Sequence, residues 1–320
     1  RATYLQKKHR LATQIGTQRH AKPNFERVRE LVQDGAIGEL TDAYAWGNRQ
    51  LRRKGYLPAQ GEPPSHLHYD LWIGPSPFHP YNPGYFGGCL SWNMYWDFGS
   101  GQIGDMGSHT MDLVWNAIDP VLPTTAQAES YPAGSQQAGN ERGKPGEPIP
   151  PNPEVTPVEL HSSFDMPANG WRPAIKVNWW QGGMMPRSPR GCVDLNKIGH
   201  GAMFKGKNGF LICDFGSRIL IPFGDADDMT YYKPRTKEQL QPPVGGFQGE
   251  WVKACKDTNK KTHCDFDYSG TMIETMLLGL VAYRAGKKIQ YDPEKGVVTD
   301  NDEANALLKR KYREGWTLNG

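Results

Sequence analysis

Five strand-like runs follow one another between residues 158 and 223 without a helical stretch between them. They read VELHSSF, AIKVNWW, GAMFKG, GFLICDF and RILIPF. Asn208-Gly209 lies between two of these runs, and Asn-Gly is the strongest short-range signal for a hairpin. Parallel strands need long crossover connections, so consecutive strands of this kind predict an antiparallel sheet.

Segments with helical periodicity and further single strands surround this region. We expect helices at residues 2–9, 24–35, 103–118, 247–256, 268–285 and 301–311, and strands at 11–16, 40–46, 124–131 and 289–291. The expected fold class is therefore α+β, with a large, mostly antiparallel sheet flanked by helices.

Two segments show little periodicity. Residues 51–98 are crowded with Pro, Gly and aromatic residues, which is typical of a functional loop whose aromatic side chains are buried somewhere. Residues 133–157 are polar and rich in Pro and Gly, and we interpret them as a mobile excursion between strands.

The charge balance argues against large polyanionic partners. The chain has 37 basic and 34 acidic residues, a formal net charge of +3, and no dense cationic block. This pattern does not indicate a nucleic-acid or membrane partner. No run reaches the roughly 18 apolar residues of a membrane span. A small or polyhydroxylated substrate fits this balance better.

Gly99, Gly101 and Gly104 have the G-x-G-x-x-G spacing associated with dinucleotide binding. That fingerprint needs a preceding hydrophobic strand and, about twenty residues on, an acidic residue that ends a second strand. Here an irregular aromatic passage precedes the glycines, and Glu129 falls too far along the chain. We therefore interpret the glycines as a turn that leads into a helix.

Asp105, His109 and Asp112 follow within that helix, at spacings that place them on one face. A histidine held beside a carboxylate is suited to proton transfer near neutral pH. The alternative interpretation is structural: Asp105 caps the helix N-terminus, and His109 is an ordinary core histidine.

The cysteines and histidines show no standard metal-binding spacing. The five cysteines are scattered, and their odd number favours free thiols. We assign no metal ligands, and a divalent metal stays an alternative because four histidines lie in expected loop or cleft segments. These are His20, His66, His68 and His109.

The chain resembles the Gfo/Idh/MocA family of oxidoreductases from end to end. The landmarks that carry the resemblance are ATQIGTQRHAKPNFERVRELVQDGAIGEL, HYDLWIGPSPFHPYNP, YWDFGSGQIGDMGSHTMDLVWNAID, GKNGFLICDF, FDYSGTMIETMLLGLVAYRAGKKIQYD and KYREGWTL. Several unrelated landmarks occur in the family's order, which makes the set specific.

The resemblance implies a two-domain enzyme that oxidises or reduces a sugar or polyol with NAD(P). Asp105 and His109 match the family's D-x-x-x-H pair and are the catalytic candidates, with His109 exchanging a proton and Asp105 orienting hydroxyl groups. The expected substrate-binding residues are His20, His68, Trp96 and Asp112. Gln18 would lie near the cofactor if a Rossmann domain is supplied.

The sequence lacks a counterpart to most of the family's N-terminal Rossmann domain. Residues 1–20 resemble only the last helix and strand of a Rossmann domain, and residues 21–320 the α+β domain that binds substrate and forms oligomers. The family's N-terminal glycine fingerprint and E-K-P lysine have no counterpart. Either the chain is part of a longer dehydrogenase, or it lacks the Rossmann domain and acts as an NAD-independent lyase or hydrolase.

A third interpretation is a non-catalytic sugar-binding module on the same sheet. Six aromatic residues of the loop could stack on sugar rings or could anchor the loop: Trp72, Tyr81, Tyr85, Trp92, Tyr95 and Trp96. A large antiparallel sheet needs its outer face covered, so we expect a homo-oligomer formed through it. The compartment stays open, since relatives are found both in the cytoplasm and behind export signals.

Overall fold

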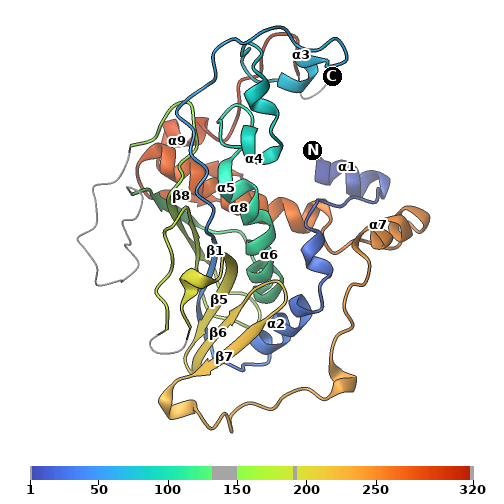
Figure 1. Cartoon of the computed structure of the whole chain (residues 1–320). Helices are drawn as coiled ribbons and strands as arrows, with labels where there is room; N and C mark the ends of the chain where they lie inside the picture. Colours follow the sequence, from blue (N-terminus) through green and yellow to red (C-terminus); the bar gives the residue numbers. More distant parts are fainter. Residues whose placement is uncertain (1, 132–149, 190–192, 318–320) are drawn as a thin grey trace.

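The computed structural model describes residues 2–131, 150–189 and 193–317 (Figure 1). Within them, nine strands form one sheet in the order β7-β6-β5-β1-β4-β3-β2-β8-β9. The strands are β1 (Leu40–Gly47), β2 (Thr125–Glu129), β3 (Leu160–Met166), β4 (Ile175–Gln181), β5 (His200–Gly206), β6 (Gly209–Cys213), β7 (Arg218–Pro222), β8 (Ile289–Asp292) and β9 (Val297–Val298).

The prediction of a mostly antiparallel sheet is confirmed. Every neighbouring pair is antiparallel except β1 and β4, which run parallel. The β5–β6 hairpin turns at Lys207 and Asn208, since Gly209 already begins β6. β1 comes early in the chain but lies in the middle of the sheet, so the residues that follow it lie at the sheet's centre.

Helices α6 (Met106–Ile118) and α8 (Phe266–Ala285) cover one face of the sheet (Figure 1). In β3, residues 160, 162, 164 and 166 are buried and alternate with half-exposed ones, as expected for a strand with one covered face. Gly279 lets α8 approach closely, because a Cβ atom there would lie 2.7 Å from the Ser162 hydroxyl oxygen. α6 contacts β1 and β5, and this contact positions its first turn.

The remaining helices are short or lie at the edges. They are α1 (Ala2–His9), η1 (Gln18–Ala21), α2 (Asn24–Gln33), α3 (Tyr69–Ile73), η2 (Pro83–Phe86), α4 (Cys89–Trp92), α5 (Gly101–Gly104), η3 (Leu195–Lys197), η4 (Gly224–Ala226), η5 (Lys237–Gln239), α7 (Phe247–Lys256) and α9 (Asp302–Ala306). None of the helices in the described part of the chain has the length and apolarity needed to cross a membrane.

The strand expected at residues 11–16 is wrong. This segment is extended but lies outside the sheet, and its backbone bonds to the region around α7 and α8 instead. Ile15 N–H donates to the carbonyl of Cys264, and the Thr262 hydroxyl donates to the carbonyl of Thr13. An apolar run reads as a strand in sequence, but a strand also needs a neighbour, and none lies beside this one in the described residues.

Two helix boundaries also differ from expectation. The helix expected over 103–118 is broken at Asp105, whose backbone (φ −85°, ψ −86°) separates α5 from α6. The helix expected over 301–311 covers only Asp302–Ala306. Asp105 therefore lies at the N-cap position of α6, and its side chain does not project from a continuous helix together with His109 and Asp112.

The irregular, aromatic-rich passage at residues 51–98 is confirmed, since it holds only three short helices. Tyr85 and Tyr95 are fully buried and form a small core with neighbouring aromatic rings. Anchoring of the loop is therefore the role of these two rings, and they do not offer a face to a sugar. Of the excursion expected at 133–157, residues 133–149 lie outside the described part.

Candidate active site

The end of β1 and the start of β5 meet the start of α6. Gly47, the last residue of β1, pairs with His200, the first residue of β5. A Cβ atom on Gly47 would lie 3.4 Å from Nδ1 of His200 and 3.5 Å from Cβ of Met106, the first residue of α6. The side chains at these three ends are therefore brought together at one end of the sheet.

Arg49 and Asp105 form an ion pair at this junction. Nη1 of Arg49 lies 3.5 Å from Oδ2 of Asp105, and the two side chains are 37% and 21% exposed. Asp105 makes no side-chain cap to α6, so the capping interpretation is not borne out. A pair this accessible adds little to stability, and both groups can turn to a ligand.

His109 lies in the first turn of α6 and is half-buried. Its Nδ1 atom has no hydrogen-bond partner among the described residues. Burial lowers the pKa of His109 below its usual 6.5; Asp105 and Asp112 oppose this shift, while Arg19 and Arg49 add to it. The imidazole is therefore neutral near pH 7 and can accept a proton.

His200 belongs to the same group. It is half-buried, and its Nδ1 atom also lacks a partner within the described ranges. Burial lowers the pKa of His200, and Arg49, Arg19 and His109 lower it further. We call this group the His109 cluster and define it as Arg19, Arg49, Asp105, His109 and His200.

The His109 cluster combines two neutral imidazoles, two guanidinium groups and one carboxylate. A neutral imidazole can act as a general base toward a hydroxyl group. Guanidinium groups donate to hydroxyl oxygens and stabilise negative charge that develops on them. A carboxylate accepts hydrogen bonds from neighbouring hydroxyls. The arrangement suits proton transfer on a molecule that carries several hydroxyl groups.

His20 and Asp112, two of the expected substrate-binding residues, lie in the interior. Nδ1 of His20 is 2.9 Å from both carboxylate oxygens of Asp112, and the side chains are 1% and 0% exposed. The Tyr268 hydroxyl donates to the same carboxylate at 2.5 Å. Burial lowers the pKa of His20, but Asp112 more than offsets this and raises it to about 10. The pair stabilises the junction of η1 with α6 from within.

Cys264 lies against this pair. One ligand atom from each of His20, Asp112 and Cys264 can be chosen so that all lie within 4.8 Å of one another. Such a group can hold a metal ion only if the imidazole and the thiol both lose their protons. The raised pKa values of His20 and Cys264 oppose this, and the Asp112 carboxylate favours a protonated His20 instead.

The other expected site residues lie apart from one another. Gln18 is exposed at the start of η1, next to Arg19 of the His109 cluster. His68 is exposed at the N-cap of α3 in the aromatic loop. Trp96 lines a separate cavity, where the guanidinium of Arg284 lies 5.3 Å from the centre of its ring. No contact between Trp96 and the His109 cluster is found in the described residues.

The glycines of the G-x-G-x-x-G motif are explained by internal packing. A Cβ atom on Gly99 would lie 2.4 Å from Cα of Asn93, and one on Gly101, whose φ is +66°, would lie 2.5 Å from the Thr156 hydroxyl. A Cβ atom on Gly104 would meet the Ser100 side chain. As expected, these glycines form the tight turn that leads into α6. They leave no space beside the turn for a pyrophosphate group.

Sequence reasoning missed Arg19, Arg49 and His200. Arg49 stands in a polar run after a strand, and His200 lies between two glycines at a strand start. Both positions are common places for functional side chains. Only the pairing of β1 with β5 brings these residues to α6, and that pairing joins residues far apart in sequence.

One family model matches part of the chain. Residues 28–130 match a family model described as "Oxidoreductase family, C-terminal alpha/beta domain". Over these residues the chain is similar to the C-terminal α/β domain of an oxidoreductase family. The model is that of Gfo/Idh/MocA proteins, so the resemblance carried by the sequence landmarks is confirmed within residues 28–130. No match was found among curated proteins.

Solved structures with related folds are distant. An NAD-binding protein from Listeria innocua is 14% identical, with a TM-score of 0.47, 87% of this chain covered and 63% of that one. Levoglucosan dehydrogenase in complex with NADH and levoglucosan is 10% identical (TM-score 0.46, coverage 88% and 66%). An Agrobacterium radiobacter oxidoreductase in complex with NAD+, L-tartaric acid and magnesium is also 10% identical (TM-score 0.41, coverage 87% and 64%). The chain spans less than two thirds of the Listeria protein, and similarity this low carries no functional argument.

Proposed function

We propose that this chain forms the substrate-binding and proton-transfer half of a sugar or polyol oxidoreductase. One observation carries the proposal: His109, half-buried with a lowered pKa, lies in a junction with two arginines and an accessible carboxylate. The family match covers Arg49, Asp105 and His109, which supports a role of this junction in an oxidoreductase. A neutral base among hydroxyl-binding groups is what oxidation of a CH–OH group requires.

In the proposed reaction, His109 accepts the proton of the substrate hydroxyl and returns it in the reverse direction. The oxidant that would take the hydride of the same carbon is NAD(P)+, which the family resemblance names. Arg49 and Arg19 stabilise negative charge on the substrate oxygen as the proton leaves. Asp105, when it turns from Arg49, accepts hydrogen bonds from neighbouring hydroxyls of the same substrate. His200, also neutral, forms a hydrogen bond with a second hydroxyl of the substrate or relays the proton.

The described residues do not fit a dinucleotide. The family's glycine fingerprint is missing from them, and the space beside their one G-x-G-x-x-G motif is occupied by Asn93, Ser100 and Thr156. We therefore derive no hydride step from this chain. By family resemblance NAD(P) is the proposed cofactor, and Gln18 is the exposed residue beside the His109 cluster that would face it.

A panel of sugars, polyols and hydroxy acids, supplied with NAD+ or NADP+, tests this function through the appearance of reduced nicotinamide. We expect turnover with at least one polyhydroxylated substrate and none with simple alcohols when a Rossmann domain is joined to the chain to hold the cofactor, since the cluster holds several hydroxyl-binding groups. Cofactor-independent cleavage of a sugar, detected by product analysis in the same panel, would favour a lyase or hydrolase and overturn the oxidoreductase proposal. Sugar binding without any turnover would favour a non-catalytic module.

A further inference from the structure

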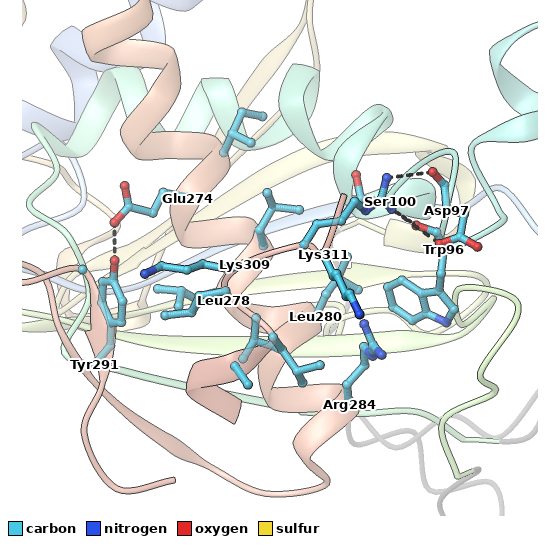
Figure 2. A pocket seen from close by; sticks show the side chains of 18 of the residues that line it. Trp96, Asp97, Ser100, Glu274, Leu278, Leu280, Arg284, Tyr291, Lys309 and Lys311 are labelled. Carbon is cyan, nitrogen blue, oxygen red and sulfur yellow. Dashed lines mark hydrogen bonds and ion pairs between the residues drawn. The ribbon is translucent and has the colours of Figure 1, made fainter. Parts of the chain in front are cut away.

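α8 is apolar on more than the side that packs on the sheet. Met272 and Met276 are fully buried in the core, whereas Leu277 is 37% exposed. A helix that is apolar all round is normally covered on all sides. On its second side α8 instead lines a cavity of about 950 Å³, which residues 306–311 and the loop around Trp96 also line (Figure 2).

The cavity wall is unevenly charged. Its lining includes four cationic side chains, Arg284, Lys309, Arg310 and Lys311, and two carboxylates, Asp97 and Glu274. Both carboxylates already accept hydrogen bonds: Glu274 from the Tyr291 hydroxyl at 2.5 Å, and Asp97 from the Tyr56 hydroxyl at 2.7 Å. The negative charges of the cavity are therefore engaged with their own neighbours.

The cations are less fully engaged. Arg310 donates to backbone carbonyls at Trp96 and Asp97, which fixes it in the wall. The side-chain amines of Lys309 and Lys311 have no hydrogen bond or ion pair within the described part of the chain, and Arg284 lies over the ring of Trp96. Figure 2 shows Arg284 and Lys311 extending toward the Trp96 end of the cavity, with Leu278 and Leu280 beyond.

We propose that this cavity binds a small amphiphilic anion, with its apolar body along α8 and its anionic head between Arg284, Lys311 and Trp96. The apolar side chains of the wall would contact the apolar body of the ligand, and the unpaired cations would bind its anionic head. The volume lies within the ~300–1,000 Å³ typical of small-ligand sites. The lining shares no residue with the His109 cluster, so this site is distinct from the proposed active site and does not depend on it.

Isothermal titration calorimetry with decanoate, decan-1-ol and decylammonium tests the proposal on the whole chain. The three probes have the same apolar body and differ in head-group charge. We expect decanoate to saturate at one molecule per chain and to bind about tenfold more tightly than decan-1-ol, since a charged head adds about one decade of affinity here. Decylammonium should bind least. Equal binding of decanoate and decylammonium, or no binding of decanoate, would overturn the proposal.

Matched variants place the binding in this cavity. Arg284→Gln and Lys311→Gln should each weaken decanoate about tenfold, whereas Lys287→Gln, an exposed cation of the same region outside the lining, should leave it unchanged. Leu277→Gln should weaken all three probes, and Leu71→Gln, at a 66% exposed leucine outside the lining, should not. Equal weakening by Lys287→Gln would show a diffuse charge effect and contradict the assigned site.

Discussion

The lowered pKa of His109 follows from the position of its ring. The ring is half-buried, and Arg19 and Arg49 lie close enough to disfavour its protonated form. A base of this kind stays competent below the pH at which an exposed histidine would already be protonated. The pH dependence of turnover therefore reports directly on the environment of His109.

We predict that the acid limb of the kcat/KM profile lies below pH 6.5, the usual pKa of histidine. Arg49→Gln should move this limb to higher pH, because it removes a nearby cation and frees the Asp105 carboxylate, and both changes favour protonated His109. Lys54→Gln removes an equal charge from an exposed residue outside the cluster and should leave the limb in place. An unmoved limb in Arg49→Gln would show that His109 is not the titrating base.

The buried His20–Asp112 pair makes a separate prediction about stability. The pKa of His20 is raised from 6.5 to about 10, so its contribution is fully present below pH 6.5 and is lost as the pH rises toward 10. Asp112→Asn should lower the free energy of unfolding by about 3–5 kcal/mol, since it leaves His20 buried without its counter-ion.

Urea unfolding across this pH range measures both effects. The free energy of unfolding of the wild type should fall from pH 6.5 toward pH 10. In Asp112→Asn it should fall less over the same range, because His20 no longer has the raised pKa that causes this part of the decrease. The control Asp267→Asn, in the exposed pair with Lys7, should cost less than about 1 kcal/mol. Equal costs for the two variants would contradict the structural role of the His20–Asp112 pair.

At the residue scale, the sequence predicted which residue types form the site better than it predicted which residues are buried. It singled out Asp105 and His109, and the structure brings both to one junction. It also grouped His20 and Asp112 as substrate ligands, although both are buried. Residue type and spacing do not report burial, because burial depends on α6, η1 and α8 packing together.

The turn before α6 is the element that sets the direction of His109. It is held by backbone contacts, with Gly101 N–H donating to the carbonyl of Asn93 at 2.8 Å. Side chains are excluded at Gly99, where a Cβ atom would lie 2.4 Å from Cα of Asn93. Backbone atoms cannot move aside as the tip of a flexible side chain can.

Gly99→Ala should therefore destabilise the fold by about 1–3 kcal/mol through overpacking. It should also lower kcat more than KM, because α6 carries the proposed base. Gly170→Ala, where a Cβ atom would meet nothing within 4 Å, is the matched control and should change neither. Thermal unfolding and steady-state kinetics on both variants measure the difference. A Gly99→Ala variant as stable as Gly170→Ala would contradict the close packing of this turn.

At the element scale, periodicity predicted the strands and the long helices, and it failed where tertiary contacts decide. The segment at 11–16 has the composition of a strand but bonds to Cys264 and Thr262. The break at Asp105 falls inside the helix expected over residues 103–118. Neither feature has a local signal, because both are fixed by residues distant in sequence.

The whole molecule leaves the outer face of its sheet partly open. A buried cluster that includes Trp46, Trp180 and Met203 covers part of this face, while Tyr44 and Phe210 at its margin stay half-exposed. An open sheet of nine strands presents apolar surface suited to a second copy. We expect this face to form the homo-oligomer.

Phe210→Glu should shift the protein toward monomer, because it places a charge in the proposed interface. Phe78→Glu, at a 64% exposed phenylalanine in the aromatic loop, is the control and should leave the assembly unchanged. Sedimentation velocity across a range of concentrations measures the change. A wild-type protein that is monomeric at all concentrations would contradict the proposal.

The most direct test of the proposed active site is kcat/KM of His109→Gln, measured with a substrate found in the panel. We predict a loss of at least about 100-fold, the usual contribution of a general base, with an unchanged melting temperature. His161→Gln, on the outer face of the sheet where the ring stacks on Trp180, should retain wild-type activity. A folded His109→Gln variant with wild-type kcat/KM would contradict the assignment of proton transfer to His109.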